Sequence, residues 1–322
     1  MRKFFRPAAV ILTAVATILT TVLRVMLTPA MQDAETGNFH VSYIIIGFIL
    51  ASIAVLSILV LSGEGRLSHT NSMIRHDRLP MGVASVVAGS VLIISSLFDG
   101  WRWKVFGHTP PPNQAIISKL DSFTLTLTLI FGVLGGMFLV WLGFKLLGGS
   151  LNFSTGFSVA ALAPVVWIWV RVVRYEVSYA SAIAVEQSFY DFVMLLFTMV
   201  FLFSFARYIS KTGKQSPRQL LICAFCTTIL TVSGSLTSII LYMLGETEAY
   251  ISSRLAGLPD LCLGIFAFCT AVCLVFARKI LEPDQQEISV ADTVSDEQES
   301  LGGDTVDDIL NDIYGTDSNE NI

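Results

Sequence analysis

The chain has 322 residues, of which 53% are hydrophobic and only 14% are charged. About a quarter of the residues in a soluble domain are charged, so this composition excludes an ordinary soluble protein and predicts a membrane protein. The formal charge of −5 conceals a segregation, because residues 1–280 carry +8 and residues 281–322 carry −13. We therefore expect a basic membrane domain over 1–280 and a cytosolic acidic tail over 281–322.

Apolar runs of membrane-spanning length follow one another along the chain. A hydrocarbon core about 30 Å thick requires roughly 20 residues of helix. The first run follows a basic N-terminus, as in a signal peptide, but its length and Arg24 favour a retained span. The sequence predicts an all-α, polytopic integral membrane protein with eight transmembrane helices, near 7–28, 41–62, 80–98, 122–147, 156–174, 189–210, 219–244 and 257–280.

The basic residues predict how these helices are oriented. Placing the N-terminus in the cytosol puts thirteen of the twenty Lys and Arg residues on the cytosolic side, as basic residues in short loops prefer. The helices then form four outward hairpins, and both termini are cytosolic. The residues that open the even-numbered helices indicate either a repeated hairpin or simple helix N-caps; they are His40, Asp121, Asp191 and Asp260.

Charged residues gather around the end of the helix predicted at 156–174. Trp167, Arg171, Arg174 and Ser178 follow the spacing of one helix face. With Arg24, these arginines would form a basic site for a carboxylate or phosphate. The alternative is that they reach toward lipid headgroups or pair with acidic side chains. The candidate ligand-binding residues are Arg171, Arg174, Asp191, Arg24 and Glu186.

The five cysteines all lie in the last two apolar runs, so no disulfide framework is indicated. Cys223, Cys226, Cys269 and Cys273 could bring four thiols together, but cysteine is also a small apolar residue that packs well in a helix. We expect no metal, no cofactor and no nucleic-acid partner. Motifs for zinc proteases, nucleotide binding and serine hydrolases are missing, which disfavours an enzyme without excluding one.

The acidic tail contains one short amphipathic pattern, over residues 304–314. A lone helix of this length is unstable in water and needs a groove on a partner. The tail is therefore either a docking segment for a cytosolic protein or a solubilising extension. The residues of the apolar stripe are Val306, Ile309, Leu310 and Ile313.

The segment from Pro164 to Phe192 resembles uncharacterised polytopic membrane proteins of anaerobic Gram-positive bacteria. The similarity rests on Pro164, Val165, Val166, Trp167, Arg171, Arg174, Ser178, Ser181, Glu186 and the run Phe189-Tyr190-Asp191-Phe192. It covers the helices at 156–174 and 189–210. The resemblance implies a bacterial plasma membrane and brings no activity or functional residue with it.

Two functions fit these patterns. The first is transport of a small solute or anion, or an accessory role in transport, through a charged site near the outer leaflet. The alternative is a membrane scaffold or sensor that works through its tail. An enzyme that acts on a lipid or a lipid-linked substrate is a third interpretation. We expect the transport function, because eight spans exceed what an anchor requires.

Overall fold

A computed structural model describes residues 5–32, 48–49, 51–53, 55–57, 75–106, 115–148, 155–179, 185–210, 217–244 and 257–276. These residues belong to one compact unit within Met1–Arg278, and helix is their only regular secondary structure. The helices are α1 (Phe5–Gln32), α3 (Arg75–Phe106), α4 (Ala115–Gly148), α5 (Thr155–Ala160), α6 (Ala163–Tyr179), α7 (Val185–Ile209), α8 (Pro217–Met243) and α9 (Gly257–Phe276).

The described part of the chain contains seven spans that are long and apolar enough to cross a membrane. They confirm the prediction of a helical membrane protein. The predicted span at 41–62 is described only at 48–49, 51–53 and 55–57, which are helical. The count of eight spans and the four-hairpin arrangement therefore stay predictions. The tail, with its pattern at 304–314, lies outside the described residues.

The span predicted at 156–174 contains a break. α5 ends at Ala160 and α6 begins at Ala163, with a turn at residues 161–162. Pro164 explains the break, because a proline has no N–H to donate and its ring clashes with the carbonyl four residues earlier. The amide of Leu162 bonds instead to the carbonyl of Val159, three residues back, at 3.0 Å. The proline thus separates α5 and α6 into two helices within one predicted span.

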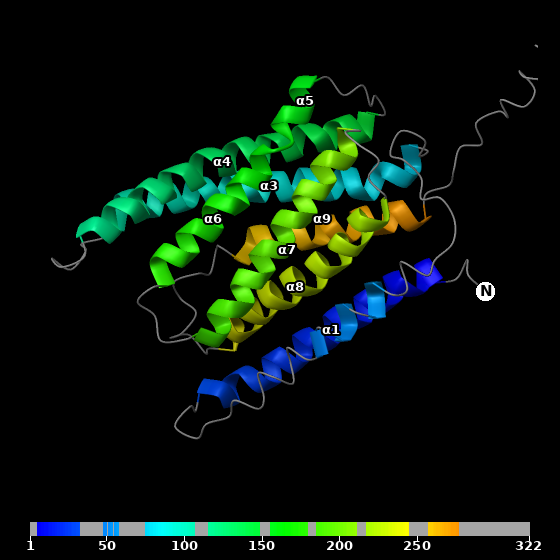
Figure 1. Ribbon diagram of the computed structural model, residues 1–322, viewed down its shortest axis with the longest axis horizontal. Coiled ribbons are helices and arrows are strands. Elements are labelled where there is room, and N and C mark those ends of the chain that lie inside the picture. The colour runs from blue at the N-terminus through cyan, green and yellow to red at the C-terminus, as the bar shows by residue number, and fades with distance from the viewer. Residues whose placement is uncertain are drawn as a thin grey trace, which may run out of the picture. The chain divides into compact units, whose positions relative to one another are not determined.

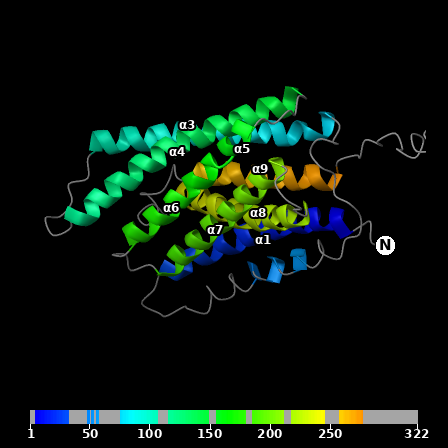
Figure 2. The same ribbon diagram turned by 45° about the horizontal axis from the view of Figure 1, so that its top comes forward.

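Six of the helices form a closed ring. Packing runs from α3 to α4, from α4 to α6, and then through α7, α8 and α9 back to α3. α1 packs outside this ring, mainly against α8 (Figures 1 and 2). α6 and α9 are not neighbours in this order, so a contact between their side chains has to cross the interior.

Aromatic side chains from α7 and α9 pack against one another in the interior. The ring of Phe266 lies 5.1 Å from that of Phe205, nearly perpendicular to it, and 6.0 Å from that of Phe201. All three side chains are buried. Edge-to-face packing of this kind stabilises a dense interior. This aromatic cluster joins α7 and α9, which are not neighbours in the order of packing around the ring.

Small residues bring α3 and α4 into direct backbone contact. A Cβ atom on Gly89 would lie 2.6 Å from the carbonyl oxygen of Gly136, and one on Gly143 would lie 2.7 Å from that of Gly82. The antiparallel register is fixed between these points, where Ser85 Oγ donates to the carbonyl of Leu139 at 2.6 Å. Close approach through small residues is a common way for membrane helices to associate.

Gly89→Ala should destabilise the protein by about 1–3 kcal/mol, because the new methyl group overlaps a backbone carbonyl that cannot move away. Thermal unfolding in detergent, monitored by size-exclusion chromatography, measures the loss of stability. Gly148→Ala is the matched control, since a Cβ there meets nothing within 4 Å. Equal stability of the two variants would contradict the packing described for α3 and α4.

Candidate functional site

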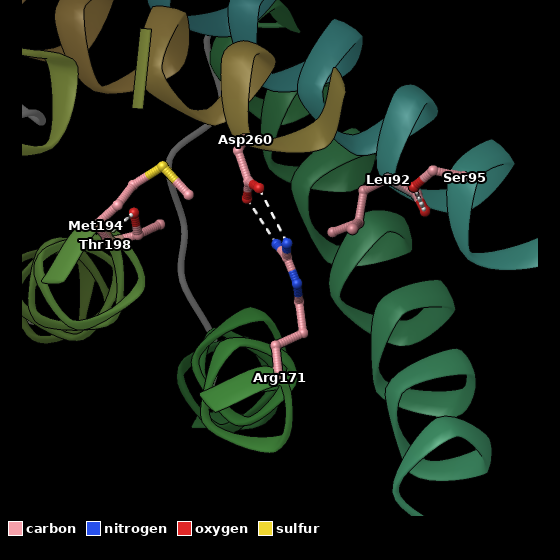
Figure 3. A network of polar contacts seen from close by, with 6 residues as sticks. All are labelled: Leu92, Ser95, Arg171, Met194, Thr198 and Asp260. Atoms are coloured by element: carbon pink, nitrogen blue, oxygen red, sulfur yellow. Dashed lines mark hydrogen bonds and ion pairs between the residues drawn. The ribbon is translucent and has the colours of Figure 1, made fainter. Parts of the chain in front are cut away.

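The centre of the candidate site is an ion pair between α6 and α9. Arg171 donates through Nη1 to Asp260 Oδ1 at 2.6 Å and through Nη2 to Oδ2 at 2.9 Å. The side chains are 17% and 4% exposed. Figure 3 shows the two groups meeting between α6 and α9, with α7 on one side and α3 and α4 on the other. The pair therefore bridges the interior of the ring.

Both helices present these residues for clear local reasons. Asp260 lies in the first turn of α9, where a carboxylate interacts favourably with the helix dipole. Arg171 lies one turn after Trp167 on the same face of α6, and its guanidinium carbon is 4.8 Å from the centre of that ring. The indole thus supports the guanidinium through a cation–π contact while the carboxylate holds its end.

Trp167 also carries a hydrogen-bond donor that is not used. The side chain is 3% exposed, and its indole Nε1 has no hydrogen-bond partner among the residues that the structure describes. Gly132 on α4 makes room for this nitrogen, since a Cβ there would come within 2.9 Å of it. A buried N–H without a partner is costly, so its presence beside the ion pair requires a reason.

A second cationic side chain enters from α1. The guanidinium carbon of Arg24 lies 3.7 Å from the centre of the Tyr190 ring on α7. The Tyr190 hydroxyl donates to the carbonyl of Leu230 at 2.7 Å and lies 2.9 Å from Ser233 Oγ, both on α8. Gly234 leaves space beside this pair, because a Cβ there would lie 3.0 Å from Tyr190 Cε1 and 3.6 Å from Arg24 Nη1. Arg24 is therefore held where α1, α7 and α8 meet.

Asp191 on α7 is within electrostatic range of both cations. It follows Tyr190 on α7 and is half-buried, and its carboxylate interacts electrostatically with Arg24, Arg171 and Asp260. Asp99, near the end of α3, interacts in the same way with Arg171. We call Arg24, Arg171, Asp191 and Asp260 the charged cluster. It gathers two guanidinium groups and two carboxylates from four helices.

The structure brings together three of the five residues predicted for the site, namely Arg24, Arg171 and Asp191. Arg174 lies on α6 and is half-buried. Glu186 belongs to α7, but its side chain lies outside the described part of the structure. The sequence also predicted that Arg171 would bind a ligand directly or pair with Asp191, Glu186 or Glu176. Its partner in the structure is instead Asp260.

Three contributing residues were not among the predicted site residues. Asp260 was interpreted only as a helix start, although an acid inside an apolar run is itself a signal of function. Tyr190 and Trp167 contribute their ring faces and N–H or O–H groups, which an apolar sequence pattern does not distinguish from packing. Each lies within four residues of a charged member of the cluster, and that proximity is the signal that could have identified them.

The cysteines are all free, and Cys262 lies two residues after Asp260 on α9. The nearest polar contact of Cys223 is with Ser204 Oγ at 4.0 Å. Within the described ranges, no group of three or more His, Cys, Asp or Glu side chains is arranged to hold a metal ion. The bidentate contact between Arg171 and Asp260 shows charge pairing and hydrogen bonding at this site.

No family model, curated protein or solved structure matches the chain.

Removing one partner of the central ion pair should be far more damaging than removing both. Arg171→Ala or Asp260→Ala leaves a buried charge without its counter-ion, which costs about 3–5 kcal/mol. The double variant Arg171→Met, Asp260→Leu should lose much less, because no charge remains. Thermal unfolding of the four proteins in detergent measures the coupling.

Arg207→Met is the matched control for that experiment. Arg207 also lies over an aromatic ring, that of Phe203 at 5.8 Å, but it is exposed on α7. Its replacement should change the stability by less than about 1 kcal/mol. Additive losses for the two single substitutions in the pair would show that the ion pair does not form.

Proposed function

We propose that this protein binds a small polar solute at the charged cluster and moves it across the membrane, or assists a protein that does so. The observation that carries the proposal is the Arg171–Asp260 ion pair, which crosses the interior of a helix ring instead of lying on its surface. Ionisable groups that face the inside of a membrane bundle commonly mark the path of an ion or solute.

The energetic cost of the cluster supports a functional role. Taking a carboxylate and a guanidinium out of water costs several kcal/mol for each ion, and their attraction offsets this only in part. Apolar residues of similar volume would hold α6 and α9 together at least as well. A protein that served only as an anchor would gain nothing from this arrangement. The buried N–H of Trp167, which has no hydrogen-bond partner among the described residues, is a second cost of the same kind.

The aromatic cluster supplies the barrier that transport requires. Phe201, Phe205 and Phe266 pack across the ring on the far side of the ion pair along α9. A solute at Asp260 would therefore be closed off from the inner side. Alternating access would need α7 and α9 to separate at these rings while the charged cluster closes toward the outside. The ion pair is suited to that closure because its two side chains come from different helices, α6 and α9.

The proposal includes the location and orientation of the protein. We place it in a bacterial plasma membrane with both termini in the cytosol and the charged cluster near the outer leaflet. This orientation rests on the distribution of Lys and Arg in the loops. It requires that residues 41–62 cross the membrane, since seven spans would put the termini on opposite sides.

Water-soluble thiol reagents test whether the site is open to solutes. In a background with all five native cysteines replaced by serine or alanine, we expect Met194→Cys to react with a charged methanethiosulfonate reagent. Met194 extends from α7 toward the ion pair (Figure 3). Labelling of intact cells and of inside-out vesicles, followed by a gel-shift assay, measures access from each side.

Val200→Cys on the same helix is the control, because Val200 is on the exposed outer face that lipid covers. It should react at least about tenfold more slowly than Met194→Cys, since a thiol in lipid forms little reactive thiolate. Labelling of Met194→Cys from both sides fits transport, and labelling from one side fits an accessory binding protein. Protection from both sides would rule out the solute site.

The eighth span can be tested in the same cysteine-free background. Ser68→Cys lies after the predicted span at 41–62, and it should be labelled only in inside-out vesicles if that span crosses the bilayer. A fluorescent protein fused after Ile322 should fluoresce, whereas a periplasmic phosphatase fused there should be inactive. Labelling of Ser68→Cys in intact cells would overturn the proposed orientation.

A further inference from the structure

We infer that the solute is a zwitterion, a small molecule that carries both a carboxylate and an ammonium group. This inference rests on the proposed function and specifies the chemical class of its solute. It follows from the composition of the charged cluster, in which the bidentate Arg171–Asp260 pair is accompanied by Asp191, whose carboxylate interacts electrostatically with Arg24, Arg171 and Asp260. A basic site, as the sequence predicts, would instead favour an anion.

Arg171 is the group that an anion would have to reach. Both of its terminal nitrogens are already bonded to the two oxygens of Asp260, at 2.6 and 2.9 Å. An anion would have to displace Asp260, whose side chain is only 4% exposed. The displaced carboxylate would then be buried beside the anion without a counter-charge. Leaving one charge of a buried pair unmatched is strongly unfavourable, and this cost offsets most of what the new pair gains.

A ligand that carries only a positive charge would create the opposite imbalance. An amine that took Asp260 away from Arg171 would leave a guanidinium unmatched in the ring. Arg24 cannot relieve this cost, because it is buried against Tyr190 and adds a second positive charge. Asp99, half-buried on α3, also interacts electrostatically with Arg171. A ligand with a single charge, of either sign, would therefore leave one member of the Arg171–Asp260 pair without a counter-charge in an apolar environment.

A zwitterion satisfies both halves of the opened pair at once. Its carboxylate can replace Asp260 on the planar fork of Arg171, and its ammonium can bond to the released Asp260 and to Asp191. The net charge of the cluster stays the same, so no unmatched charge is created. The indole N–H of Trp167, which has no partner among the described residues, lies next to Arg171 as an additional donor.

Three probes of one carbon skeleton separate these possibilities: leucine carries both charges, isocaproate only the carboxylate and isoamylamine only the ammonium. Each is added to the Met194→Cys protein in nanodiscs, and the rate of thiol labelling and the unfolding temperature are recorded. Glycine, acetate and methylamine repeat the comparison for a smaller solute. We expect the zwitterion of at least one set to protect at a concentration about tenfold below that of its singly charged analogues, a difference of about 1.4 kcal/mol.

Single-charge variants should change the preference in opposite directions. Asp260→Asn removes a negative charge with little change of shape, so the anionic probe should then protect better than the zwitterion. Arg171→Gln removes a positive charge and should favour the amine. If Asp260→Asn fails to elute as a folded monodisperse peak, Asp191→Asn replaces it, because it also removes a negative charge from the cluster, and it should shift the preference toward the anion.

The outcomes distinguish this inference from the proposed function. If isocaproate or acetate protects as well as its zwitterion, or if no probe protects a site that is nevertheless labelled, the zwitterion inference is overturned while the solute site remains. If Met194→Cys is not labelled from either side and no probe has an effect, the proposed function fails as well. Protection by a zwitterion that is unchanged in Asp260→Asn and Arg171→Gln would also overturn the inference.

Discussion

The Arg171–Asp260 ion pair sets the conditions under which the rest of the ring can be stable. In a bilayer, neither group has water available in the apolar region, so each charge needs its counter-ion and its hydrogen bonds from the protein. The bidentate geometry supplies both, and the face of Trp167 supports the guanidinium from its own helix. Because α6 and α9 are not neighbours in the ring, the pair can form only when the helices between them are correctly placed. The charged cluster therefore depends on the whole ring.

The packing that brings the pair together is made mostly of small and hydroxylated residues. Gly89 and Gly136 let α3 and α4 approach at backbone distance, and α4 in turn carries α6. On α8, hydroxyl groups bond to carbonyls in their own helix, as in Thr228 to Ala224 and Thr237 to Ser233 at 2.7 Å. These hydroxyls are satisfied and do not compete for the charged groups. The polar character of the ring is thus concentrated in the charged cluster and in Tyr190.

The sequence predicted the class of the protein and part of the site for different reasons. Length and apolarity identify a spanning helix without any knowledge of its neighbours, which is why the seven spans of the described part agree with the runs read from the sequence. Arg24, Arg171 and Asp191 could be named because a charge inside or beside an apolar run is costly wherever it lies. These arguments use only the sequence around each residue. They were sufficient for features that depend only on that sequence, namely the spans and the charged residues within or beside them.

The parts that the sequence did not predict depend on contacts between distant residues. The pairing of Arg171 with Asp260 joins positions 89 residues apart, and no pattern within either helix indicates it. The break before α6 had a local cause in Pro164, but proline is tolerated in membrane helices often enough that its presence alone did not predict a turn. α3 also continues to Phe106, beyond the predicted end at residue 98, because Asp99 ends the apolar run without ending the helix.

Arg24 shows how a helix outside the ring becomes part of the site. α1 packs on α8, yet its arginine reaches between α7 and α8 and lies over Tyr190. On an isolated α1, this residue would cost about 2.5–3.5 kcal/mol at the bilayer centre and less near the end of the helix, where it lies. Its burial in the folded protein is therefore compensated only after α7 and α8 are in place. The Tyr190 hydroxyl, held by Leu230 and Ser233, fixes the ring that receives it. The position of α1 is thereby coupled to Asp191, a carboxylate that also interacts electrostatically with Arg171, so a change in the charge of Asp191 acts on the first helix as well as on the ring.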